Sequence, residues 1–338
     1  MSEETAKATA LRINTHCVSN NIQNVIITFH GGEPLLAGHK RLQKYYEVFQ
    51  QEITNASVRY GMQTNAVLID DDYIKIFKKF NATVSVSIDG PQQIHDKNRV
   101  SHSGGPSFDL VYKGLNTLVK NAPEVLSGLL AVIDVESHPS VQLNFFGSLG
   151  IPRIDFLLPL NHWDRKPARP TNDPEIYGRW LFDLFDHWNS NSHLHFLRIR
   201  ILEHLISRLV GGISLYEVGT MDPVRLLVIS SSGNYECVDS IKSTGSGLQK
   251  TGFSVFESEI DVALESPLIT KRFSAEKQLC AECLQCSDMS VCGGGYFPHR
   301  FKASATPNEF DNPSVYCSDL KWLYNALRNK ISEQTLYK

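Results

Sequence analysis

The chain has 338 residues, of which 33 are Lys or Arg and 36 are Asp or Glu, and its formal net charge is −3. This balance gives no electrostatic reason to bind a polyanion, so we expect no nucleic-acid partner. No run of about 18 apolar residues and no apolar signal core is present, so we expect no membrane partner and a cytoplasmic location, where thiols stay reduced.

The first two hundred residues alternate between short β-branched runs and amphipathic stretches. Residues 2–20 have a helical pattern with Ser2 as the N-cap. The strands expected next are 24–29, 58–64, 83–89, 127–135 and 153–160, and the helices between them are 39–53, 70–80, 108–121 and 139–150. Five β–α alternations with right-handed crossovers predict an α/β fold with a parallel sheet, either open or curled toward a barrel.

Polar residues and glycines directly follow three of these strands. The segments are "HGGEP" at 30–34, "QTNA" at 63–66 and "SIDG" at 87–90. Each segment alone is ordinary turn chemistry. Because the carboxyl ends of parallel strands meet at one edge of a sheet, the three together indicate a ligand pocket. Glu33, held between glycines and a proline, would present a fixed carboxylate or backbone carbonyls to a cationic group.

The pattern changes after the fifth strand. Residues 161–175 are rich in proline and polar side chains, which indicates a long connection. Helices are expected at 176–190 and 194–210, followed by a hairpin at 224–239. The amphipathic stretch 318–334 predicts a helix whose apolar face covers the sheet domain or the segment before it.

Five of the seven cysteines lie close together near the C-terminal end, whereas Cys17 and Cys237 stand alone. The five are Cys280, Cys283, Cys286, Cys292 and Cys317. The spacing C-x2-C-x2-C-x5-C indicates metal ligation in a reducing compartment. Glycines 293–295 let the backbone approach the sulfurs and leave N–H groups to donate to them. At this point zinc and an iron–sulfur cluster remain equally open, each with a structural or a chemical role.

Several segments in order carry a resemblance to a known family. They are "FHGGEPLL", "QTNA", "VSVSIDGPQQIHDKNRV", "GGPSFDLVYKGL" and "CLQCSDMSVCGGGYFPHR". The chain resembles the radical S-adenosylmethionine (SAM) enzymes with a SPASM domain, and most of all the peptide maturases that build cyclophane crosslinks. The resemblance implies a partial (β/α)6 barrel over residues 1–205 and a small cysteine-rich SPASM domain over residues 206–338.

The resemblance also implies a set of cofactor-binding residues. The "GGE" segment would hold the amino group of the methionine moiety, and Arg99 would meet the methionine carboxylate through its two-pronged guanidinium. The strand at 129–132 would supply an apolar wall near the adenine. The residues implied to surround SAM are Gly31, Gly32, Glu33, Asn65, Ser87 and Arg99.

The cysteines match the family in part. The resemblance implies that one auxiliary [4Fe–4S] cluster is held by Cys283, Cys286, Cys292 and Cys317, which favours iron–sulfur over zinc. Tyr296 stands where a second auxiliary cluster would need a cysteine. Cys237 and Cys280 are therefore expected either as core thiols or as ligands of a partial second site.

The sequence departs from the family in one further respect. Radical SAM enzymes hold the SAM-cleaving cluster with Cys-x3-Cys-x2-Cys, and this spacing is absent from the 338 residues. The family's first strand and cluster loop are missing, so the barrel is expected to lack its first strand. Either the chain is an N-terminally truncated product, which we favour, or it is a degenerate relative. In both cases we expect it to be inactive as given.

The implied function is post-translational crosslinking or oxidation of a side chain in a ribosomally made precursor peptide. A flavodoxin or ferredoxin would donate electrons, the auxiliary cluster would accept an electron, and Asp239 is our candidate for the base that takes a proton. Two alternatives remain. One is a non-catalytic iron–sulfur or zinc protein that binds a peptide, and the other is a SPASM dehydrogenase of the sulfatase-maturing type.

Overall fold

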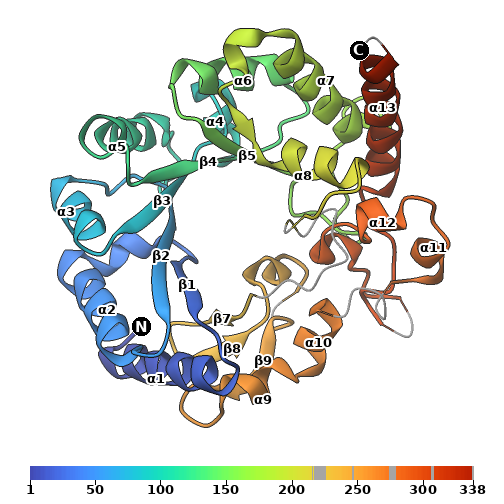
Figure 1. The fold of residues 1–338 in the computed structure, drawn as a ribbon. Coiled ribbons are helices and arrows are strands. Elements are labelled where there is room, and N and C mark those ends of the chain that lie inside the picture. Colours follow the sequence, from blue (N-terminus) through green and yellow to red (C-terminus); the bar gives the residue numbers. More distant parts are fainter. Residues whose placement is uncertain (215, 217–225, 246, 274–278, 306–307, 337–338) are drawn as a thin grey trace.

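A computed structural model describes residues 1–214, 216, 226–245, 247–273, 279–305 and 308–336. Its main feature is a sheet of six parallel strands that neighbour one another in chain order. The strands are β1 (Asn24–Phe29), β2 (Ser57–Thr64), β3 (Ala82–Ser87), β4 (Leu126–Val132), β5 (Arg153–Leu157) and β6 (Arg198–Ile199). The sheet curls into an incomplete barrel (Figure 1).

The five predicted strands are confirmed, and the sixth, β6, was not predicted. It is only two residues long and pairs with the first two residues of β5, so it leaves little trace in the sequence pattern. Strands β3, β4 and β5 end two or three residues before the predicted ends. The positions beyond the strands include Asp89, Asp134 and Pro159, where the chain leaves the sheet.

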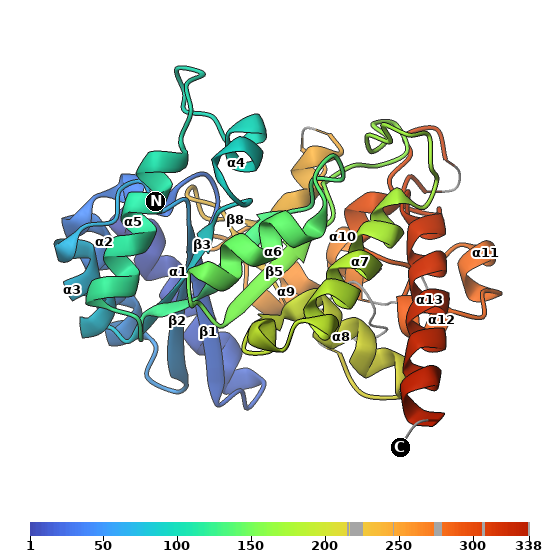
Figure 2. The same ribbon diagram turned by 90° about the horizontal axis from the view of Figure 1, so that it is seen from above.

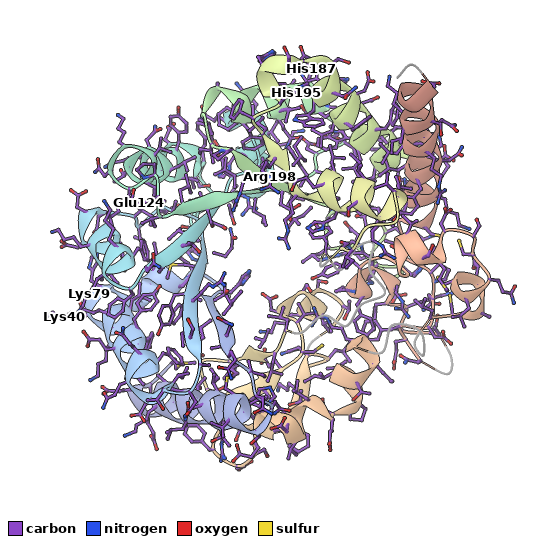
Figure 3. The ribbon with its side chains drawn as sticks, in the orientation of Figure 1. Lys40, Lys79, Glu124, His187, His195 and Arg198 are labelled. Carbon is purple, nitrogen blue, oxygen red and sulfur yellow. The ribbon has the colours of Figure 1, made fainter. Side chains whose placement is uncertain are left out.

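Helices cover the outside of the barrel, as right-handed crossovers require. Their outer surface carries charged side chains such as Lys40 and Lys79 (Figure 3). Ser2 caps the first helix by accepting a hydrogen bond from the Thr5 N–H, as predicted. The helices of this layer are α1 (Glu3–Ser19), α2 (His39–Glu52), α3 (Asp71–Lys79), α4 (Gln92–Asn98), α5 (Phe108–Asn121), α6 (Pro139–Ser148), α7 (Ile176–Ser190) and α8 (Arg200–Leu209).

The two faces of the strands differ in character. On β3, Val84 and Val86 are fully buried against the helix layer, whereas the alternate residues Ser85 and Ser87 face the barrel interior. A closed eight-stranded barrel fills its interior with bulky apolar side chains. Small polar side chains on the inner face of this sheet leave room there for a ligand.

The remainder of the chain forms a small antiparallel sheet and a group of short helices. The predicted hairpin is present as a pair of strands, although its residues 224–225 lie outside the described residues, and a third strand was not predicted. The elements are β7 (Val228–Ile229), β8 (Asn234–Glu236), β9 (Lys250–Ser254), α9 (Ile260–Leu264), α10 (Pro267–Phe273), α11 (Ala281–Leu284), α12 (Met289–Cys292) and α13 (Cys317–Leu336).

This part contacts the barrel in several regions, of which two lie at opposite sides. Near the N-terminus, the Arg12 Nε donates to the Val255 carbonyl at 2.9 Å. At the opposite side, α13 lies along α7, as the predicted covering helix should (Figure 2). There Asp319, 1% exposed, accepts hydrogen bonds from Arg169 and from the Tyr177 N–H. The expected domain boundary at 205/206 falls inside α8 and stays a prediction.

Within the part of the chain that the structure describes, none of the helices has the length and apolar character needed to cross a membrane.

Candidate functional site

The loop after β1 is held in place by the carboxylate of Glu33. Its Oε1 accepts hydrogen bonds from the Thr64 hydroxyl at 2.7 Å and the Leu35 N–H at 3.0 Å, and its Oε2 accepts one from the Asn65 N–H at 2.7 Å. The carboxylate thus caps the 3-10 turn η1 (Pro34–Ala37) and fastens this loop to the end of β2. The predicted rigidity of Glu33 has a clear physical basis.

The two glycines before Glu33 are required by backbone conformation. Gly31 has φ +80° and Gly32 has φ +39°, and no atom lies within 4 Å of where a Cβ would be. The glycines therefore serve a left-handed turn that leaves this stretch of backbone exposed. Carbonyl groups in such an open turn are accessible to a cationic ligand.

The ends of β2 and β3 also meet, as predicted. Gln63 Nε2 donates to Ser87 Oγ at 2.8 Å, and Ser87 is 8% exposed. The side chain of Asn65 accepts from the Val67 N–H at 3.0 Å, which shapes the turn after β2. The structure therefore places Ser87 and Asn65 at the same sheet edge as the "GGE" loop.

Arg99 is directed by Asp89, which lies just beyond β3. Arg99 Nε donates to Asp89 Oδ2 at 2.7 Å, and Asp89 Oδ1 accepts from the Val132 N–H at 2.9 Å. Among the described residues, the terminal nitrogens of Arg99 have no protein partner. The guanidinium is oriented through one edge, and its other edge can still bind a carboxylate.

Asp239 reaches the same loop from the distant half of the chain. Its Oδ2 lies 3.4 Å from His30 Nδ1, directly before the two glycines. Asp239 begins the 3-10 turn η3 (Asp239–Ser243), in which the Ser240 hydroxyl contacts the Tyr296 hydroxyl at 2.5 Å. Since Tyr296 follows the cysteine-rich loop, η3 connects the strand-end loop with the cysteines.

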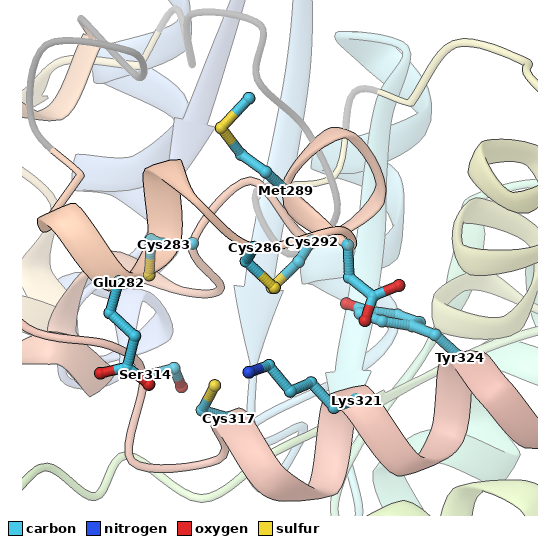
Figure 4. Close-up of a pocket in the computed structure, with 11 residues that line it drawn as sticks. Glu282, Cys283, Cys286, Met289, Cys292, Ser314, Cys317, Lys321 and Tyr324 are labelled. Atoms are coloured by element: carbon cyan, nitrogen blue, oxygen red, sulfur yellow. The ribbon is translucent and has the colours of Figure 1, made fainter.

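The cysteine-rich segment folds around one small pocket (Figure 4). Cys283 comes from α11, Cys292 ends α12, and Cys317 begins α13, so several segments converge on it. The four cysteines predicted as ligands all line it. The complete lining is Glu282, Cys283, Cys286, Asp288, Met289, Cys292, Gly294, Ser314, Cys317, Lys321 and Tyr324.

The three glycines after Cys292 are needed for conformation and for space. All three have positive φ, between 58° and 81°. A Cβ on Gly294 would stand 2.3 Å from Leu279 Cδ2, and one on Gly295 would stand 3.0 Å from Ser314 Cβ. No other residue fits this turn at the pocket wall without displacing its neighbours.

The pocket is unfavourable for bare thiolates. Burial raises the pKa of Cys292 to about 11 and also raises the pKa values of Cys283 and Cys317. Lys321 opposes this, and the neighbouring Cys317 and Cys286 raise its own pKa. These three thiols, which need a positive partner to ionise, match the chemistry of a metal or cluster site.

A buried hydroxyl lies beside the sulfurs in the same pocket. Tyr324 is fully buried, and its hydroxyl lies against the thiol of Cys292. A sulfur-rich cluster accepts hydrogen bonds, so this donor fits the proposed group. Within the described residues, no group of three or more His, Cys, Asp or Glu side chains is arranged so that it could hold a metal ion, so the four cysteines line one pocket without standing in ligand geometry.

Cys237 and Cys280, which were expected either as core thiols or as ligands of a partial second site, lie outside the pocket lining. Cys237 is 1% exposed in an apolar cluster with Ile241 and Phe297. Cys280 does not line the pocket but contacts Cys283. The pocket therefore brings together the four expected cysteines without these two, whose possible role as ligands stays a prediction.

A buried carboxylate in the barrel was not predicted from the sequence. Asp155 on β5 is 4% exposed, and burial raises its pKa to about 6 although Arg200 stands 3.5 Å away. Tyr216 OH lies 3.4 Å from its Oδ1. The sequence signal is "RIDFL", where an acidic residue interrupts an apolar strand. Asp155 lies inside a strand, whereas the predicted polar rim consists of residues at strand ends.

Comparison with known proteins gives relatives over most of the chain, although no protein-family model matches it. It is 26% identical over 326 residues to a cysteine-type anaerobic sulfatase-maturating enzyme of Clostridium novyi (strain NT), covering 92% of this chain and 82% of that protein. It is 29% identical over 194 residues to a serine-type anaerobic sulfatase-maturating enzyme of Bacteroides thetaiotaomicron, covering 52% of this chain and 46% of that protein.

Solved structures agree with this result. Native anSMEcpe with bound AdoMet matches with a TM-score of 0.82 at 21% identity, over 98% of this chain and 89% of that chain. Streptococcus suis SuiB bound to precursor peptide SuiA matches with a TM-score of 0.57 at 16% identity, over 92% of this chain and 68% of that chain. The resemblance to radical SAM/SPASM enzymes and the expected fold are therefore confirmed.

Proposed function

We propose that this chain supplies the SAM-binding barrel and the auxiliary-cluster region of a radical SAM/SPASM enzyme that modifies a side chain of a peptide. The observation that carries the proposal is the series of contacts from His30 through η3 to Tyr296. These contacts connect the strand-end loop with the cysteine pocket. The related structures that contain AdoMet and peptides support the same assignment.

Different strand-end residues would bind different parts of the SAM molecule. The open turn at Gly31 and Gly32 would receive the ammonium group, with Glu33 keeping the turn rigid through its three hydrogen bonds. Arg99, oriented by Asp89, would bind the carboxylate. Ser87 and Asn65 would complete the polar rim. SAM, when bound and reduced, supplies the radical that abstracts hydrogen from the substrate.

The cysteine pocket would hold one [4Fe–4S] cluster through Cys283, Cys286, Cys292 and Cys317. Such a cluster supplies a one-electron acceptor. The glycine turn keeps water from one wall, and Tyr324 and Lys321 present a donor and a cation from another. An external flavodoxin or ferredoxin is the proposed electron source. Cys17 and the five C-terminal cysteines are free thiols, which suits a reducing compartment such as the cytoplasm.

Asp239 is the proposed base of the reaction. It stands beside the strand-end loop, and its carboxylate is partly exposed at 37%, so a substrate can reach it. His30 contacts Oδ2 and leaves Oδ1 to accept a proton from the substrate. His30 would thus fix which oxygen acts.

Oxidation of a cysteine or serine side chain is the modification that the likeness favours. The TM-score of 0.82 to anSMEcpe exceeds that of 0.57 to SuiB, and the curated relatives are sulfatase-maturating enzymes. Crosslinking of a ribosomally made precursor peptide is the second candidate, supported by the SuiB likeness over 92% of the chain.

Binding assays test these proposals directly. The anaerobically purified chain should bind SAM in calorimetry, and Arg99→Ala should weaken binding at least tenfold. A labelled peptide with a central cysteine or serine should bind more tightly in the presence of SAM than a peptide rich in aromatic residues. Iron without SAM binding would instead favour the non-catalytic iron–sulfur reading, and zinc without iron would favour a zinc-containing peptide-binding protein.

A further inference from the structure

The first turns of α13 carry three pocket residues on one face. Cys317, Lys321 and Tyr324 follow one another at spacings of four and three, which places their side chains in a row on a helix. All three line the cysteine pocket. In Figure 4 the Lys321 side chain extends over the pocket toward Cys317 and Cys286.

The charge of Lys321 acts most strongly on the sulfurs of Cys317 and Cys286, and less strongly on the nearby carboxylates of Glu282 and Asp288. No Asp or Glu of the described residues lies within ion-pair distance of its ammonium group. The acidic side chains that share the pocket are Glu282 and Asp288, and Asp288 is already paired with Arg328 at 2.7 Å.

Tyr324 adds a hydrogen-bond donor to the wall of the cysteine pocket that carries the Lys321 cation. It is fully buried, and its hydroxyl lies against the thiol of Cys292, one of the four expected ligands. A hydroxyl in this position can donate a hydrogen bond to a ligand sulfur once the cluster is held. The donor and the cation face the same space.

We propose that Lys321 and Tyr324 raise the reduction potential of the cluster held by the four cysteines. The inference rests on the proposed function, because it requires that cluster. Reduction adds one electron to the cluster, and a cation or a hydrogen-bond donor beside its sulfurs stabilises the added negative charge. Both residues therefore adapt the cluster to accept electrons and set it apart from a purely structural cofactor.

The test compares matched variants of the reconstituted chain. Lys321→Met removes the charge at similar length, Lys321→Arg keeps it, and Tyr324→Phe removes only the hydroxyl. Lys330→Met serves as the control, because Lys330 lies on the same helix but pairs with Asp186 at 2.9 Å. Iron and sulfide content and the visible spectrum are measured first. The midpoint potential then follows from anaerobic titration with dithionite and mediators, monitored by electron paramagnetic resonance.

We expect Lys321→Met to lower the one-electron reduction constant roughly tenfold, a shift of about 59 mV to more negative potential. Tyr324→Phe should shift the midpoint potential in the same direction. The midpoint potentials of Lys321→Arg and Lys330→Met should equal that of the unmodified chain. Equal potentials in all five proteins, each with full iron, would overturn the inference. Absence of iron from the unmodified chain would instead overturn the proposed function, so the two failures are distinguishable.

Discussion

Thr64 Oγ1 donates a 2.7 Å hydrogen bond to Glu33 Oε1, which fastens the exposed glycine turn to the end of the neighbouring strand. Thr64→Val removes this donor at nearly constant volume. We expect a loss of about 1 kcal/mol in unfolding free energy and weaker SAM binding. Urea denaturation and calorimetry measure the two effects. Thr117→Val, where the exposed hydroxyl bonds only to the Lys113 carbonyl, is the matched control. Unchanged SAM affinity in Thr64→Val would contradict the role given to the turn.

The cysteines should fall into two classes in a serine scan. Changing any one of the four pocket cysteines should reduce bound iron well below the roughly four atoms of a cubane cluster. Cys17→Ser should leave iron unchanged, because Cys17 is buried in α1 far along the chain from the pocket. Iron analysis and the absorption spectrum after anaerobic reconstitution give the result. Full iron in Cys292→Ser would refute the ligand set.

The 338-residue chain should bind SAM without cleaving it. The sequence contains no Cys-x3-Cys-x2-Cys segment to hold the cluster that reduces SAM. Incubation with SAM and dithionite under anaerobic conditions, followed by chromatography, should reveal no 5′-deoxyadenosine above the protein-free background. Formation of that product in multiple turnovers would show that other residues assemble a reducing centre.

The buried pair between Arg169 and Asp319 should be costly to break. Asp319 is 1% exposed and also accepts from the Tyr177 N–H at 2.9 Å. Asp319→Asn leaves the guanidinium without its counter-charge, so we expect a loss of about 3 kcal/mol or more. Glu203→Gln, which disrupts the exposed pair with Arg198, should change stability little. A Tm of Asp319→Asn equal to that of the unmodified chain would contradict this view of the α7–α13 contact.

His299 should make the apo-protein less stable in acid. Burial lowers its pKa from 6.5 to about 3, so between these values the unfolded chain binds a proton that the folded chain excludes. Stability is therefore lost as the pH falls below 6.5, by about 1.4 kcal/mol per pH unit. Asp155 acts oppositely, because its raised pKa favours the folded state as the pH falls from about 6.

Variants separate these two contributions. His299→Phe should lose less stability than the unmodified chain between about pH 7.5 and pH 5.5, because the Asp155 contribution is present in both proteins and cancels from the comparison. Phenylalanine suits the site because His299 packs against the Tyr316 ring at 4.7 Å. Urea midpoints at both pH values provide the comparison. An identical pH dependence in the two proteins would exclude His299 as the acid-sensitive group.

The sequence was sufficient for most of the barrel because each long strand has β-branched residues and helices such as α3 and α5 have a clear apolar period, whereas the short helix α4 was not predicted. The meeting of strand ends followed from topology alone, which is why Glu33, Asn65 and Ser87 could be placed at one edge in advance. β6 was not predicted because a strand of two residues is too short to show an alternation of polar and apolar side chains. Strand alternation could have revealed Asp155, but only once the inner face of the barrel was known to be open.

Long-range contacts could not be predicted in the same way. His30 and Asp239 are far apart in sequence and meet only because η3 packs onto the strand-end loop. The cysteine spacing indicated a shared site. Which face of the C-terminal helix turned toward it depended on how α13 packs on α7, so Lys321 and Tyr324 became visible only in the structure.

The contact between α7 and α13 is close enough to limit movement of the whole molecule. A Cβ on Gly178 would stand 2.3 Å from the Asp319 carbonyl oxygen, so the two helix backbones touch. Cys317, which lines the cysteine pocket, is two residues from Asp319. The contact between the helices therefore keeps the cysteine pocket against the barrel wall. The contact thus holds the start of α13, and with it one wall of the cysteine pocket, at a fixed distance from the barrel.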